Sequence, residues 1–112
     1  MQIPSIASII KLHRQSAGPL SFSPAALRAL DALAPAMPDI LVGFGVDEGG
    51  DAYAIVSRRR GKLVALVIAG TAGRTSIVNH TGATVATLGN DEAGIGWALQ
   101  CEVESGGSPW ET

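Results

Sequence analysis

The sequence predicts an α+β domain in which two N-terminal helices pack on an antiparallel β-meander of five to six strands. Two features of the pattern support this prediction. Apolar residues recur at helical spacing up to about residue 34, and from Ile40 onward they alternate with small or polar residues, which is the period of a β-strand. Short turns rich in glycine and charged residues separate the alternating segments, and strands joined by such turns pair antiparallel with their chain neighbours.

The first helix is expected over residues 4–15. Ile6 and Ile10 fall on one face of this segment at helical spacing. Gly18 and Pro19 follow it, and a glycine succeeded by a proline is a common way for a helix to end.

The second helix has the clearest start signal in the chain. Ser23 is a good N-cap residue, and Pro24 occupies the first helical position, where its missing N–H costs nothing. Pro35 and Pro38 are expected to end the helix and to start a turn, because the residue before a proline avoids the helical region.

The alternating segments predict strands over residues 40–46, 52–58, 62–69, 75–79, 83–88 and 95–103. The third segment is apolar on both faces, which is typical of a central strand. If the helices cover one face of the sheet, then Val64, Leu66 and Ile68 on the other face need a cover. A homodimer, a partner protein and the C-terminal tail are the candidates.

The last segment has the most regular alternation. Its apolar side chains stand at every second position, namely Ile95, Trp97, Leu99, Cys101 and Val103. A helix is the alternative over residues 95–101, but a period of two favours a strand. Cys101 then lies on the apolar face, where a thiol behaves as a small hydrophobe rather than as a nucleophile.

Composition and length indicate one domain. The chain has 112 residues, of which 46% are apolar and 16% charged, so it is not of a disordered composition. We expect a single α+β domain over residues 1–104 and a flexible tail over residues 105–112, since Ser105-Gly-Gly-Ser-Pro is a linker composition. Trp110 ends this tail and could anchor in a partner or fold back on its own domain.

The composition also indicates the cellular compartment of the protein. Cys101 is the single cysteine, which excludes an internal disulfide and indicates a reducing compartment. No apolar run approaches the ~20 residues needed to cross a bilayer. The N-terminus lacks a signal-peptide pattern, so we expect a cytoplasmic protein. A transit peptide is the alternative for residues 1–30, which are basic and contain serines but no acid; a packed helix is the preferred reading.

The turns carry a polarised charge layout. In a meander, successive turns fall at alternate ends of the sheet, and strands of seven residues separate those ends by ~20 Å, more than the ~8 Å Debye length at physiological salt. One end then carries the acidic residues Asp47, Glu48, Asp51, Asp91 and Glu92, and the other carries the basic residues Arg58, Arg59, Arg60 and Lys62. These residues predict that one pole docks a protein of opposite charge. The alternative is that they only keep the turns solvated.

No motif in the chain predicts a catalytic, metal or cofactor site. The glycine loop at residues 70–75 lacks the lysine and the spacing of a P-loop, and a strand rather than a helix is expected to follow it. The basic turn at residues 58–62 has no aromatic residues interleaved, as single-strand binding would require, and the net charge of −2 argues against nucleic acid.

The sequence therefore favours a non-enzymatic protein-binding module, of the kind of a small inhibitor or an immunity-type protein. A bacterial or phage protein, or one encoded on a mobile element, that acts on a defence complex fits this description. We expect it to form a homodimer, with no membrane partner. Two alternatives stay open: a small enzyme or ligand-binding domain with a site at a dimer interface, and nucleic-acid binding through the basic turn.

Overall fold

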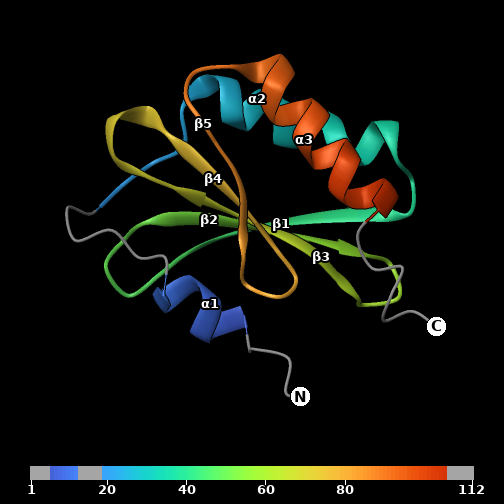
Figure 1. The fold of residues 1–112 in the computed structure, drawn as a ribbon, viewed down its shortest axis with the longest axis horizontal. Coiled ribbons are helices and arrows are strands. Elements are labelled where there is room, and N and C mark those ends of the chain that lie inside the picture. The colour runs from blue at the N-terminus through green and yellow to red at the C-terminus, as the bar shows by residue number, and fades with distance from the viewer. Residues whose placement is uncertain (1–5, 13–18, 106–112) are drawn as a thin grey trace.

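A computed structural model of the protein describes residues 6–12 and 19–105. Its elements in chain order are α1 (Ile6–Leu12), α2 (Pro24–Ala36), β1 (Ile40–Val46), β2 (Ala52–Arg58), β3 (Leu63–Ala69), a 3-10 turn η1 (Thr71–Gly73), β4 (Thr75–Asn79), β5 (Thr84–Leu88) and α3 (Glu92–Ser105) (Figure 1). The α+β class and the antiparallel sheet are confirmed. The described part of the chain has five strands rather than six, and one of its helices is C-terminal.

The sheet is a simple meander. Its strand order is β1-β2-β3-β4-β5, and every neighbouring pair is antiparallel. Consequently the turns alternate between two ends of the sheet, as predicted. β3 is the central strand and is buried from Val64 to Ala69, whereas β1 and β5 are the two edges.

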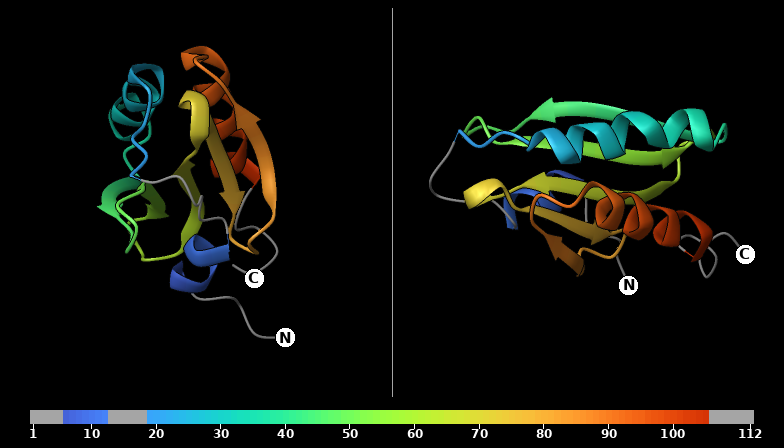
Figure 2. Two further views of the ribbon diagram at one scale, coloured as in Figure 1. Left: turned by 90° about the vertical axis from the view of Figure 1, so that its left-hand side faces the viewer. Right: turned by 90° about the horizontal axis from the view of Figure 1, so that it is seen from above.

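Helices cover both faces of the sheet (Figures 1 and 2). On one face, α2 and α3 lie side by side, and their core side chains include Leu30 and Leu33 from α2 and Ile95 and Leu99 from α3. On the other face, α1 packs against the sheet and forms a smaller apolar cluster. The two N-terminal helices therefore pack on opposite faces, and not together on one.

The short helix α1 provides the cover that the sequence left undecided. Its Ile9 and Ile10 pack with Leu66 and Ile68, so neither a partner nor a second copy is needed there. Val64 was predicted on this face as well, but it belongs to the core beneath α2 and α3. The register between β2 and β3 is irregular just beside it, and this irregularity moves Val64 to the opposite face.

The start of α2 follows the prediction. The Ser23 hydroxyl accepts a hydrogen bond from the Ala26 N–H at 3.2 Å, and Pro24 is the first helical residue. The helix ends slightly later than expected, because Pro35 is kept inside its last turn. Met37 closes the end by donating its N–H to the carbonyls of Leu33 and Ala34.

The C-terminal segment contradicts the predicted strand over residues 95–103, because it forms the helix α3. Asp91 caps this helix: its side chain accepts the Gly94 N–H at 2.9 Å, and its carbonyl accepts the Ile95 N–H at 3.0 Å. Ile95, Leu99 and Val103 are buried at intervals of four, a spacing that suits a helix as well as a strand. The N-terminal cap favours the helix.

Candidate protein-binding surface

The acidic turn between β1 and β2 uses two of its three carboxylates internally. Asp47 accepts the N–H groups of Gly49 and Asp51, at 2.8 and 2.9 Å. Asp51 is buried and accepts the Leu20 N–H at 2.8 Å, which fastens the segment before α2 to the start of β2. Glu48 is the acid of this turn that faces solvent.

The other two predicted acids lie at the start of α3. Asp91 is its N-cap, as described above, and Glu92 in its first turn forms an ion pair with Arg28 of α2. This pair is exposed and joins the two helices that share a face of the sheet. Both carboxylates also lie where a helix N-terminus favours negative charge.

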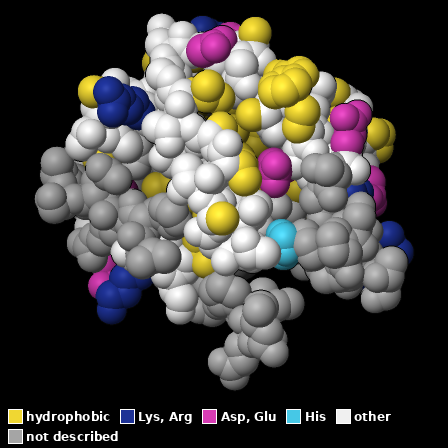
Figure 3. Space-filling model, viewed as in Figure 1, with side chains coloured by type: hydrophobic (Ala, Val, Ile, Leu, Met, Phe, Trp, Pro, Cys, Tyr) yellow, Lys and Arg dark blue, Asp and Glu magenta, His cyan; other side chains and the backbone are white. Residues whose placement is uncertain are grey.

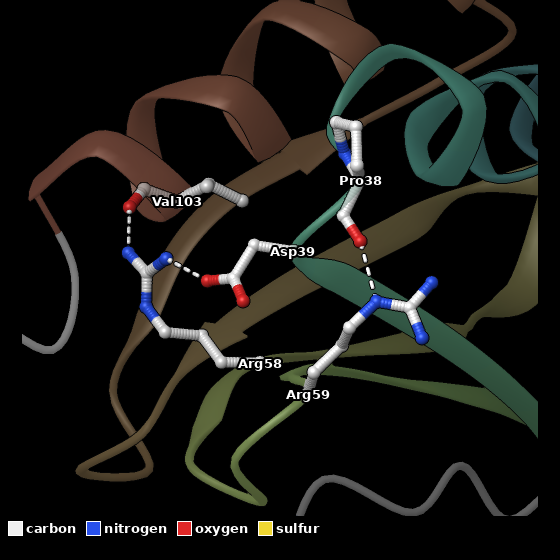
Figure 4. A network of polar contacts seen from close by, with 5 residues as sticks. All are labelled: Pro38, Asp39, Arg58, Arg59 and Val103. Carbon is white, nitrogen blue, oxygen red and sulfur yellow. Dashed lines mark hydrogen bonds and ion pairs between the residues drawn. The ribbon is translucent and has the colours of Figure 1, made fainter.

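The basic turn is tied into the fold through two of its arginines (Figure 4). Arg58 donates to the Asp39 carboxylate at 3.0 Å and to the Val103 carbonyl at 2.7 Å. Arg59 donates through Nε to the Pro38 carbonyl at 2.6 Å. Val103 lies in the last turn of α3, so Arg58 satisfies a helix-end carbonyl. Its positive charge also interacts favourably with the negative end of the helix dipole.

The remaining basic residues of this turn differ in exposure. Arg60 is exposed, and Lys62 is half-buried. The predicted basic pole therefore exists at one end of the sheet, but part of its charge is balanced inside the protein. Trp110 and the rest of the predicted tail, apart from Ser105 in α3, lie outside the described residues.

The largest exposed apolar side chain in the described part of the chain is Trp97, which is 70% exposed on α3. The predicted strand would have placed it on the same apolar face as Leu99. In the helix the two side chains point in different directions, because two residues correspond to about 200° of rotation. In Figure 3, hydrophobic side chains gather over the region of α3 and beside it.

A groove of about 340 Å³ lies between α2 and α3. It is lined by Ala29, Ala32, Leu33, Glu92, Ala93, Gly96 and Gln100. Small side chains dominate this lining, so the groove is apolar and shallow. Trp97 directly follows one of the lining residues, Gly96, and Ala93, Trp97, Gln100 and Glu104 form one exposed stripe along α3 at spacings of three and four.

The second exposed apolar region is the edge strand β1. Leu41, Phe44 and Val46 are all exposed there, and Val46 is exposed by 63%. The Phe44 ring makes an edge-to-face contact with Phe22, with 6.4 Å between the ring centroids. Sequence reasoning identified these residues as a strand but did not identify Phe44 and Val46 as exposed.

Two titratable groups in the described part of the chain have shifted pKa values. Among residues 6–12 and 19–105, no group of three or more His, Cys, Asp or Glu side chains is placed to hold a metal ion. Partial burial lowers the pKa of His80 in the β4–β5 turn and raises the pKa of Glu102 on α3. None of the described helices combines the length and the apolar character that a membrane span requires.

Comparison of this chain with protein-family models, with curated proteins and with solved structures found no match.

Proposed function

We propose that the protein is a non-enzymatic protein-binding module, in the manner of a small cytoplasmic inhibitor or immunity-type protein, and that its partner docks on the α2–α3 face. One observation carries this proposal: Trp97 stands 70% exposed beside the apolar groove. Tryptophan is enriched among the residues that dominate binding energy at protein interfaces, because it removes a large apolar area from water and retains a donor N–H.

The shape of the surface favours one kind of ligand. The groove runs between two helices and is lined by small side chains, which lets the apolar ridge of a third helix approach closely. Glu104 lies at one end of the exposed stripe that contains Trp97, and no basic residue of α3 balances it. The partner that fits is therefore an amphipathic helix with an apolar face and basic residues at its margin.

The test compares Trp97→Ala with Val85→Ala, a change at an exposed apolar residue of β5. Both tagged variants and the wild type are used to capture proteins from a host lysate, and the captured protein is then purified and titrated. We expect wild type and Val85→Ala to bind it alike. Trp97→Ala should raise the dissociation constant about 30-fold or more, as expected for a hot spot. Equal binding by all three proteins would refute the proposed surface.

A further inference from the structure

Among the described residues no strand pairs with the outer side of β1, and on that side the Ile40 N–H donates to the Met37 carbonyl at 2.9 Å. The Asp47 N–H donates to the Asp51 carbonyl at 3.0 Å, and the Arg59 N–H donates to the Asp39 carbonyl at 2.9 Å. In an antiparallel ladder the backbone groups of successive residues point to alternate sides. The odd-numbered residues of β1 therefore direct their N–H and C=O groups toward β2, and the even-numbered residues direct theirs away from the sheet.

The outward groups belong to Val42, Phe44 and Val46, and no described strand lies beyond them. Natural edge strands are usually protected by charges, proline, a bulge or shortness. β1 has none of these: its seven residues pair with β2 in unbroken register and include no charged residue or proline. The opposite edge, β5, is shorter and has an irregular register with β4.

We propose that two copies of this chain associate through β1, antiparallel and about a twofold axis, so that their two sheets become one continuous sheet. The occupant of the exposed edge is then a second copy of the chain. This inference concerns a surface other than the α2–α3 face and does not depend on the proposed function.

The pairing that uses every residue of β1 places the twofold axis at Gly43, the middle of the strand. Val42 then lies opposite Phe44 of the second copy, and Ile40 lies opposite Val46 of the second copy. These pairs put outward-pointing backbone groups face to face, as a ladder requires. The Ile40 N–H is the exception, because it already donates to the Met37 carbonyl, so Ile40 contributes only its carbonyl. A side chain at Gly43 would meet no atom of its own chain within 4 Å, so the face of the sheet is open beside the proposed axis.

The polarised turns make this arrangement electrostatically complementary. An antiparallel pair places the acidic end of one sheet beside the basic end of the other. In this register Glu48 lies beside Pro38 of the second copy, whose carbonyl holds Arg59. Figure 4 shows the two terminal nitrogens of Arg59 turned away from that carbonyl, and Arg59 is exposed.

The same register also places two carboxylates near each other, and both are already satisfied. Asp39 of one copy would lie opposite Asp47 of the other. Asp39 is paired with Arg58, and Asp47 accepts two backbone N–H groups of its own turn. Their repulsion is therefore reduced, whereas Glu48 and Arg59 attract each other at both ends of the shared strand pair.

The first test measures the mass of the full chain in solution by sedimentation over a range of concentrations. The wild type is expected to be dimeric. Val46→Lys places a charge on the outer edge and should yield a monomer, whereas Val85→Lys on β5 is the matched control and should stay dimeric. A monomeric wild type, or equal dissociation by both variants, would overturn the inference. Trp97→Ala should leave the dimer intact, so this test and the partner-binding test fail independently.

The second test exchanges the charges that the pairing brings together. Glu48→Arg and Arg59→Glu should each raise the dimer dissociation constant about tenfold, the effect expected of a lost interfacial charge pair. The double variant should return to the wild-type value, because the exchanged charges attract again across the twofold axis. If the double variant had a higher dimer dissociation constant than either single variant, Glu48 and Arg59 would not be opposite each other and this register would be wrong.

Discussion

Residues 40–46 and 95–103 have similar patterns and different structures. Both segments alternate apolar residues with other types, and both contain glycine, yet the first is the strand β1 and the second lies in the helix α3. The two segments also differ at their N-terminal boundaries. Asp91 satisfies a free N–H at the start of α3, whereas the carboxylate of Asp39, which precedes β1, pairs with Arg58. Regular alternation is therefore not sufficient to assign a strand.

The two segments also bury different sets of residues. In α3 the buried positions are four apart, and Trp97 between them is exposed. In β1 one face is progressively uncovered toward the acidic turn, from buried Ile40 to exposed Val46. Both segments thus present apolar side chains to solvent, α3 from a helix face and β1 from a sheet edge.

The largest expected difference between the two segments is in core stability. Leu99→Ala removes a fully buried side chain from beneath α3 and should lower the free energy of unfolding by about 2–5 kcal/mol. Val46→Ala on β1 should change it by no more than about 0.5 kcal/mol, apart from any effect on self-association. Urea denaturation, at a protein concentration too low for the dimer to form, measures the free energy of unfolding of both variants. Similar losses in the two variants would contradict the burial of Leu99 and the exposure of Val46.

Arg58 tests how the far end of α3 is held. Arg58→Met keeps most of the side-chain volume but removes the bonds to Asp39 and Val103, and should cost about 2 kcal/mol of unfolding free energy. Arg60→Met, at an exposed neighbour, is the control and should cost little. Thermal unfolding of both variants measures the difference. Equal melting temperatures would show that the contact adds no stability.

The cap of α3 should have a smaller effect. Asp91→Ala removes the acceptor of the Gly94 N–H and should cost about 1 kcal/mol. Asp91→Asn retains an acceptor oxygen and should recover most of that loss. Denaturant titration followed by circular dichroism measures both variants. A neutral Asp91→Ala variant would indicate that the helix is specified by packing alone.

The smallest effect is expected at Glu102, whose pKa is raised by burial. A raised pKa means that the folded protein binds the proton more tightly than the unfolded chain does, so stability falls as the pH rises through the folded pKa. Glu102→Gln should therefore raise the melting temperature slightly at neutral pH, and the gain should vanish at a pH below the unfolded pKa. A gain that persisted in acid would have another cause.

Between residues 40 and 88, the strand boundaries predicted from the sequence agree with the structure to within about one residue. The residues of the turns explain this accuracy. Gly61, between β2 and β3, and Gly82, between β4 and β5, adopt positive φ angles, a conformation that glycine reaches without strain. The hairpins are local, so short-range signals are enough to define them.

The parts that sequence reasoning missed depend on contacts between distant segments. The placement of α1 on the second face and the bond from Arg58 to Val103 each join residues far apart in the chain. The exposed position of Trp97 was missed for a different reason, because it follows from the helix assignment. The Asp91 cap and the acidic Glu92 in the first turn were the available signals for that helix.

The exposure of Trp97 is the central claim, and fluorescence quenching tests it most directly. Trp97 and Trp110 are the two tryptophans of the chain, so Trp110→Phe leaves Trp97 as the single reporter. Its emission should resemble that of tryptophan in water, and acrylamide should quench it nearly as well as it quenches the free amino acid. A blue-shifted emission that resists quenching would show that Trp97 is buried, and would contradict both the helix face and the proposed binding surface.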